Sequence, residues 1–256
     1  MRNELGRRQG LPFLKFLSRD LVEAACRRCN HCWRERLYTP WITLSIFLSQ
    51  VLSDDHSCDD AVDRFQKFRF DQGLAAVAPE TASYCEARRR LPEGLAWNLV
   101  RRTGRASHQR ADDPWLFHGR AVKIPDGSTV TMPDTPENQA AHPQATSQEP
   151  GVGFPIARIL VVFSLAVGTV LDAVLGPYQG KQTSELALLR QIMSVFHQSD
   201  VALADLFFCS YWVIAALQAR GVDVVVRPDG VREAREGQSL SRASRHDVSM
   251  RLKTGS

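Results

Sequence analysis

The chain has 256 residues and a mass of 28.7 kDa, which is enough for one large domain or two small ones. Hydrophobic residues make up 44% and charged residues 23%, so disorder along the whole chain is excluded. The formal net charge of +4 is unevenly distributed: residues 1–120 contain 20 Lys and Arg against 15 Asp and Glu, and residues 121–256 contain 12 against 13. The arginine clusters of the first half suit phosphate contacts, and solvated helix faces are an equally good interpretation of them.

The sequence contains no signal that predicts a membrane or an export route. Apolar runs such as 159–167 stop well short of the ~20 residues that a membrane span needs. No apolar segment precedes Gly10, so no signal peptide is expected. Six cysteines in a chain of this length do not predict a disulfide scaffold. We therefore expect a cytoplasmic protein.

Residues from about 11 to 110 have the periodicity of helices. A helix over 37–52 is predicted to begin with Thr39 as its N-cap and Pro40 in its first turn. Residues 57–68 predict a second helix, with Ser57 as its candidate N-cap and with Ala61, Val62 and Phe65 on one apolar stripe. The first half of the chain is therefore expected to be all helical.

A further predicted helix over 81–91 ends in three consecutive arginines, Arg88, Arg89 and Arg90. Cations are favourable near the C-terminus of a helix because they oppose its dipole. We expect these arginines to contact DNA phosphates, so that duplex binding weakens steeply with salt.

The second half of the chain begins with strand patterns. Residues 122–126 predict a short strand that runs into a turn at 127–128, and residues 132–153 have the composition of a loop. Buried strands over 156–164 and 169–175 are expected to form an antiparallel hairpin. The second half of the chain is therefore expected to begin with β-strands.

Strands and helices then alternate. Thr183 is a candidate cap for the next helix, a buried strand is expected over 201–205, and a helix over 210–220 precedes a strand over 222–227. Residues 228–256 have no period and predict an irregular tail. The pattern indicates an α/β fold with a mixed sheet behind an all-helical N-terminal region.

Two aspartates share one context in this predicted sheet. Asp126 and Asp205 each follow a short apolar strand, and the carboxyl ends of strands are where sites assemble in open α/β sheets. Carboxylates on adjacent strands are suitable ligands for Mg²⁺, which promotes phosphoryl transfer. The alternative is that both aspartates are ordinary turn formers.

Six blocks of sequence surround these aspartates and fill most of residues 34–227. They are RERLYTPWITLSIFLSQVLSDDHSCDDAV (34–62), SYCEARRRLPEGL (83–95), VKIPDGSTVTMPDTPENQAAHPQ (122–144), PGVGFPIARILVVFSLAVGTVLDAVLGPYQGK (150–181), SELALLR (184–190) and LADLFFCSYWVIAALQARGVDVVVR (203–227). In this order they resemble bacterial DDE transposases of the insertion-sequence-four family.

The resemblance implies a helical DNA-binding region over 1–113 and an incomplete ribonuclease H-like catalytic domain over 114–227. Asp126 would match the first catalytic carboxylate and Asp205 the second, and both would hold Mg²⁺ or Mn²⁺. The implied partner is double-stranded DNA at insertion-sequence ends, with a homodimer in the DNA complex and no membrane. The implied location is the bacterial cytoplasm, in association with the nucleoid.

The chain also departs from the family's pattern. Leu206 stands where an Arg usually follows the second aspartate, and 228–230 replace a basic or His-containing segment. The family's catalytic Glu lies in a Tyr…Arg…Glu…Lys signature that does not occur in these 256 residues, and Glu233 and Glu236 lack that context. These departures predict a truncated or frame-shifted copy without the third catalytic carboxylate.

Three functions stay open from the sequence. The first is a transposase that cleaves and transfers DNA strands with Mg²⁺. The second is a catalytically inactive remnant that only binds DNA. The third is a stand-alone ribonuclease H-like nuclease, which would need a further acidic residue near the site.

Two other features are open to a structural interpretation. Cys26, Cys29 and Cys32 have a spacing that can hold Zn²⁺ or part of an iron–sulfur cluster, but no second knuckle follows, so ordinary helix cysteines are the default. Trp212 opens a predicted helix and is expected in the core rather than in base stacking.

Overall fold

The computed structural model describes residues 17–226, except 79, 150, 181, 182, 206, 207 and 209. The chain divides into two compact units, Met1–Gln109 and Arg110–Ser256. The predicted boundary at 113/114 lies a few residues beyond this division. The described part of the first unit is helical and that of the second contains a sheet, as the sequence predicts. The predicted tail over 228–256 lies outside the described residues.

The helical unit contains α3, α4 and α5, which match the predicted helices over 37–52, 57–68 and 81–91, and also α2 and α6, which lie within the stretch expected to be helical. Their bounds are α2 Arg19–Arg28, α3 Pro40–Leu52, α4 Cys58–Asp71, α5 Ala82–Arg90 and α6 Glu93–His108. Thr39 Oγ1 accepts a hydrogen bond from the backbone N–H of Ile42 at 3.5 Å, and Ser57 Oγ accepts one from that of Asp60 at 3.1 Å. These side chains satisfy backbone donors that would otherwise have no partner at the start of α3 and α4.

Two apolar clusters hold the helical unit together. One joins α3, α4 and α5 around the fully buried side chains of Ile46, Phe65 and Tyr84. The other joins α2 and α6 around Val22 and Leu95. The first cluster therefore packs three consecutive helices together, and the second brings together the first and last described helices of the unit.

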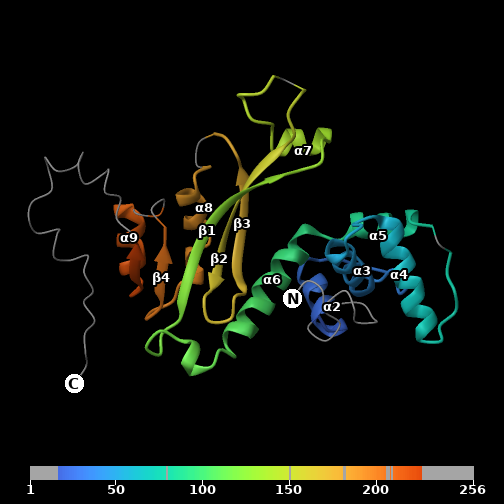
Figure 1. The fold of residues 1–256 in the computed structure, drawn as a ribbon, viewed down its shortest axis with the longest axis horizontal. Coiled ribbons are helices and arrows are strands. Elements are labelled where there is room, and N and C mark those ends of the chain that lie inside the picture. The colour runs from blue at the N-terminus through green and yellow to red at the C-terminus, as the bar shows by residue number, and fades with distance from the viewer. Residues whose placement is uncertain are drawn as a thin grey trace, which may run out of the picture. The chain divides into compact units, whose positions relative to one another are not determined.

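The second unit contains five described strands. Their bounds are β1 Val122–Thr131, β2 Ile156–Ser164, β3 Val170–Pro177, β4 Val201–Ala204 and β5 Asp223–Val226. The order across the sheet is β3-β2-β1-β4-β5 (Figure 1). The β1–β2 and β2–β3 pairs are antiparallel, whereas β1–β4 and β4–β5 are parallel. The expected mixed sheet with a hairpin is therefore observed.

Short helices connect these strands. They are α7 Pro136–Ala141, α8 Glu185–Gln191 and α9 Tyr211–Gln218, with 3₁₀ turns at Asp113–Trp115 and Met193–Val195. Side chains of α8 and α9 belong to the same core cluster as Leu160, Ala202 and Ala204, so both helices cover one face of the sheet. None of the helices in the described ranges is long and apolar enough to cross a membrane.

Three local predictions for this unit are wrong. Residues 127–128 do not form a turn, because β1 continues through them to Thr131. The loop over 132–153 contains α7, with Thr135 as its N-cap. Ser184, not Thr183, caps α8 by accepting a hydrogen bond from Ala187 N–H at 3.2 Å.

Gly127 explains the first of these errors. A Cβ at this position would run into the side chain of Glu185 on α8. Arg158 on the neighbouring strand holds Glu185 there through an ion pair with an N···O distance of 3.3 Å. The glycine therefore leaves room for the Glu185 side chain beside the middle of β1 and does not form a turn.

Candidate functional site

Asp126 lies in the middle of β1, not at the end of the strand as the sequence predicts. Its backbone pairs with Val161 of β2, and the next pair is Gly127 with Leu160. Leu160 belongs to the core beneath the helices, and successive side chains of a strand point to opposite faces. Asp126 therefore faces away from α8 and α9, and its side chain is exposed.

Asp205 directly follows β4 and is also exposed. The parallel register of β1 and β4 pairs Val122 with Val201 and Lys123 with Ala202. Asp126 and Asp205 each lie three residues beyond the second of these pairs, so the same count along both chains leads to the two aspartates. Ala202 and Ala204 face the helix-covered core, so the alternation puts Asp205 on the opposite face, the face of Asp126.

The sheet face that both aspartates share is partly apolar and open. Leu203 of β4 pairs with Val225 of β5, and these side chains are 37% and 48% exposed. Within the described part of the chain, no group of three or more His, Cys, Asp or Glu could together hold a metal ion. The carboxylates named so far on this face are Asp126, within β1, and Asp205, directly after β4.

A buried ion pair fixes the register between β1 and β4, and sequence reasoning missed it. Lys123 is 1% exposed, and its Nζ lies 2.5 Å from Asp200 Oδ2 and 2.8 Å from the carbonyl oxygen of Val195. Asp200 Oδ2 also accepts a hydrogen bond from the backbone N–H of His197 at 2.6 Å. The signal that could have revealed this pair is a lysine within the apolar start of β1.

Arg120 reinforces the same junction from the surface. Its guanidinium donates to the carbonyl oxygens of Ser199 and Asp200 at 2.8 and 3.0 Å, and it pairs with the Asp223 carboxylate at 2.6 Å. Together with the buried pair, these bonds tie the start of β1 to the residues that lead into β4 and β5. They position the two strands on which the site aspartates lie.

The three arginines predicted to contact DNA do not share one environment. Arg88 is half-buried: it donates to Gln50 Oε1 at 3.0 Å and lies over the rings of Phe47 and Tyr84. Arg89 and Arg90 are exposed on the last turn of α5. The expectation of three arginines on an exposed helix end thus holds for two of them, and the contacts of Arg88 stabilise the helical unit.

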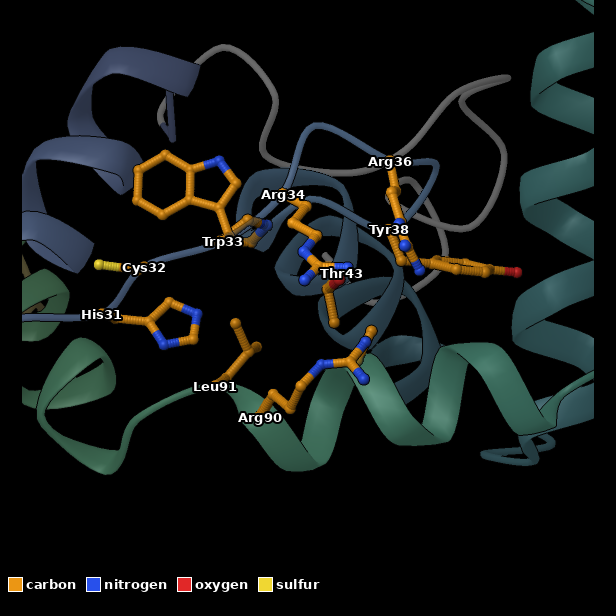
Figure 2. Close-up of a pocket in the computed structure, with 11 residues that line it drawn as sticks. His31, Cys32, Trp33, Arg34, Arg36, Tyr38, Thr43, Arg90 and Leu91 are labelled. Atoms are coloured by element: carbon orange, nitrogen blue, oxygen red, sulfur yellow. The ribbon is translucent and has the colours of Figure 1, made fainter.

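A cavity of about 400 Å³ lies beside Arg90 in the helical unit, and Figure 2 shows it. We call it the arginine pocket because three arginines line it, two from the segment before α3 and one from the end of α5. The remaining lining residues include aromatic, hydroxyl and apolar side chains. The lining residues are His31, Cys32, Trp33, Arg34, Arg36, Tyr38, Pro40, Thr43, Ala87, Arg90 and Leu91.

The cysteine triplet is spread over different surroundings. Cys26 is buried in α2, where burial raises the pKa of its thiol to about 11. Cys29 is the C-cap of α2, and Cys32 is exposed in the following segment. Trp212, expected in the core, is instead 71% exposed on α9. Its position is a correction to the sequence-based expectation, because α9 turns Val213 and Leu217 toward the core.

Comparison with known proteins adds no identification. Neither the models of known protein families nor the curated proteins contain a match to this chain.

Proposed function

We propose that this chain is a transposase of the DDE type, of the insertion-sequence-four family, in which the helical unit binds duplex DNA and the sheet holds a divalent cation. The observation that carries the proposal is the register of β1 and β4. It pairs Val122 with Val201 and Lys123 with Ala202, and counting three residues further along each chain leads to Asp126 and Asp205, which are both exposed.

The topology of the sheet supports this assignment. An antiparallel meander, β1 to β3, is extended at its β1 edge by two parallel strands, β4 and β5. A ribonuclease H-like sheet has this order and these directions. The α8 and α9 crossovers lie on one face, which leaves the opposite face open to a substrate.

The ion that we propose for this site is magnesium, because both proposed ligands are carboxylates. Mg²⁺ prefers oxygen ligands, keeps several waters, and is commonly held by one or two carboxylates together with substrate phosphates. Asp126 and Asp205 would supply the two carboxylates. When bound, the ion supplies a Lewis acid for phosphoryl transfer. In this proposal, the Lys123–Asp200 pair links β1 to the residue that leads into β4, and so supports the two segments that contribute the carboxylates.

The same ligand count limits the chemistry of the 256-residue chain. A two-ion mechanism clamps both the attacking and the leaving oxygen, and two carboxylates hold a second ion only weakly. We therefore propose that this chain binds DNA and the cation without joining strands, which is the behaviour of an inactive DNA-binding remnant.

A strand-transfer assay tests the proposal. Purified protein is mixed with Mg²⁺ or Mn²⁺ and with duplex DNA that carries the ends of the insertion sequence, and joined DNA products are measured. In a parallel experiment, DNA binding is measured by filter retention at increasing salt. We expect retention that weakens steeply with salt and no joined product.

Two results of this assay would contradict the proposal. Retention independent of salt would remove the role of the helical unit in DNA binding. Metal-dependent joining that disappears in Asp126→Ala would confirm the site and refute the limit set by two carboxylates. Asp126→Ala is also expected to retain DNA as well as the unaltered chain, because Asp126 lies outside the helical unit.

A further inference from the structure

We propose that the arginine pocket binds one nucleotide of a nucleic-acid strand, with the phosphate on Arg34, Arg36 and Arg90 and the base against Trp33. This inference rests on the proposed DNA binding of the helical unit and assigns it a specific site. The ligand class is a phosphodiester-linked nucleotide.

The charge of the pocket favours an anion. No Asp or Glu is among its lining residues. In the part of the chain that the structure describes, no carboxylate forms an ion pair with Arg34 or Arg36, and Arg90 has only a 3.8 Å contact with Glu86 at the surface. The guanidinium groups of Arg34 and Arg90 lie near Thr43 in Figure 2. A guanidinium group binds phosphate through paired N–H donors, and the negative charge of a bound phosphate would reduce the repulsion between neighbouring arginines.

The other side of the pocket is aromatic. The rings of His31 and Trp33 are nearly parallel, with an interplanar angle of 19° and centroids 6.3 Å apart. The Trp33 indole N–H donates to Glu35 Oε1 at 2.9 Å, and Arg19 donates to Glu35 Oε2 at 2.8 Å. These two bonds, together with packing of the indole against the cluster of α2 and α6, orient the ring before any ligand arrives, and an oriented aromatic ring is suited to stacking with a base.

Glu35 stands between Arg34 and Arg36 in the sequence, but its carboxylate pairs with Arg19 and not with the arginines of the pocket. The hydrogen bond from Trp33 is the largest effect and lowers the pKa of the Glu35 carboxyl; burial opposes it, and the hydrogen bond and charge of Arg19 lower the pKa further. Glu35 therefore stays ionised and bound to Arg19, outside the set of lining residues.

The size of the pocket distinguishes a nucleotide from a bare phosphate. About 400 Å³ lies within the range of pockets that bind small organic ligands, roughly 300–1,000 Å³. A bare phosphate would leave the aromatic side empty, whereas a nucleotide has both an anionic group and a planar ring. Arg34, Arg36 and Arg90 are exposed, so a strand can continue beyond the pocket.

Substitutions in the full chain test the site by fluorescence anisotropy. The probes are a labelled single-stranded oligonucleotide and a labelled duplex. We expect Arg34→Ala and Arg90→Ala each to weaken binding about tenfold and to reduce the salt slope by about one. Trp33→Ala should weaken single-strand binding about tenfold. Arg34→Lys should keep the salt slope and lose part of the affinity, since Lys lacks the guanidinium fork.

Arg89→Ala is the matched comparison. Arg89 and Arg90 are neighbours on α5, both are exposed, and both contact Glu86, but Arg89 does not line the pocket. General electrostatics predicts equal losses for the two variants, whereas the pocket predicts a loss of only about twofold for Arg89→Ala. Circular dichroism melting temperatures equal to that of the unaltered chain establish that the variants are folded.

Two outcomes separate this inference from the proposed function. If the chain binds DNA and Arg34→Ala, Arg89→Ala and Arg90→Ala lose equal affinity, the pocket is refuted and DNA binding stands. If the chain binds neither probe, DNA binding itself fails. Titration with a deoxynucleoside monophosphate and with inorganic phosphate then decides the source: binding of either, without binding of a strand, overturns the assignment to nucleic acid.

Discussion

Replacing Lys123 by Met is the sharpest test of how the sheet positions its aspartates. Met keeps most of the aliphatic volume of the buried side chain and removes the ammonium group. Asp200 then loses its partner at 2.5 Å and keeps the hydrogen bond from the His197 backbone N–H. The carbonyl oxygen of Val195 also loses a donor. The perturbation is therefore an unpaired buried charge with little change in packing.

The expected cost is large because the pair is almost inaccessible to solvent. The side chains of Lys123 and Asp200 are 2% and 10% exposed. Breaking a buried pair by removing one partner costs about 3–5 kcal/mol. For a unit of this size, that loss corresponds to a fall in the melting temperature of roughly 10 °C or more. The double variant Lys123→Met/Asp200→Asn removes the orphaned charge and should recover most of the loss.

Thermal unfolding followed by circular dichroism measures these effects in both variants. We expect Lys123→Met alone to lower the melting temperature much more than the double substitution does. A loss below about 1 kcal/mol for Lys123→Met, or equal losses for the single and double variants, would refute the argument that this pair sets the β1–β4 register.

The remaining predictions concern side-chain packing. Oxidised glutathione should convert Cys58 and Cys85 to a disulfide, because their Sγ atoms lie 3.6 Å apart; a peptide mass spectrum without this cross-link would contradict the packing of α4 on α5. With iodoacetamide at pH 8, Cys26 should be alkylated last of the described cysteines, since it is buried and its pKa is raised to about 11; early labelling would show that α2 is not packed as described. Gly127→Ala should destabilise the sheet by about 1–3 kcal/mol in chemical denaturation, and Glu185→Ala should relieve much of this cost; additive losses would exclude the contact.

The parts of the fold that the sequence predicts correctly depend on local physics. Thr39 with Pro40, and Ser57, mark the starts of α3 and α4, because capping groups act within three residues of the helix that they begin. The hairpin over 156–177 follows from two apolar runs around Gly168, whose φ of 63° suits a turn. These signals need no knowledge of the rest of the chain.

The parts that sequence reasoning missed depend on distant contacts. The Gly127–Ser128 pair is typical of a turn, but Gly127 lies within β1, where it leaves room for the Glu185 side chain of α8. Arg88 stands in a run of arginines that is typical of an exposed helix end. It is half-buried because it donates a hydrogen bond to Gln50, which lies 38 residues earlier in the sequence. The arginine pocket likewise combines α5 with the segment before α3. Only the packing of the helices brings these residues together.

The divalent-cation site is the central claim, and titration with Mn²⁺ followed by electron paramagnetic resonance tests it most directly. We predict that the unaltered chain binds Mn²⁺, that Asp126→Asn and Asp205→Asn each abolish this binding, and that Glu137→Gln, an exposed carboxylate on α7, leaves it intact. Binding that survives in both aspartate variants, or that Glu137→Gln removes equally, would contradict the account.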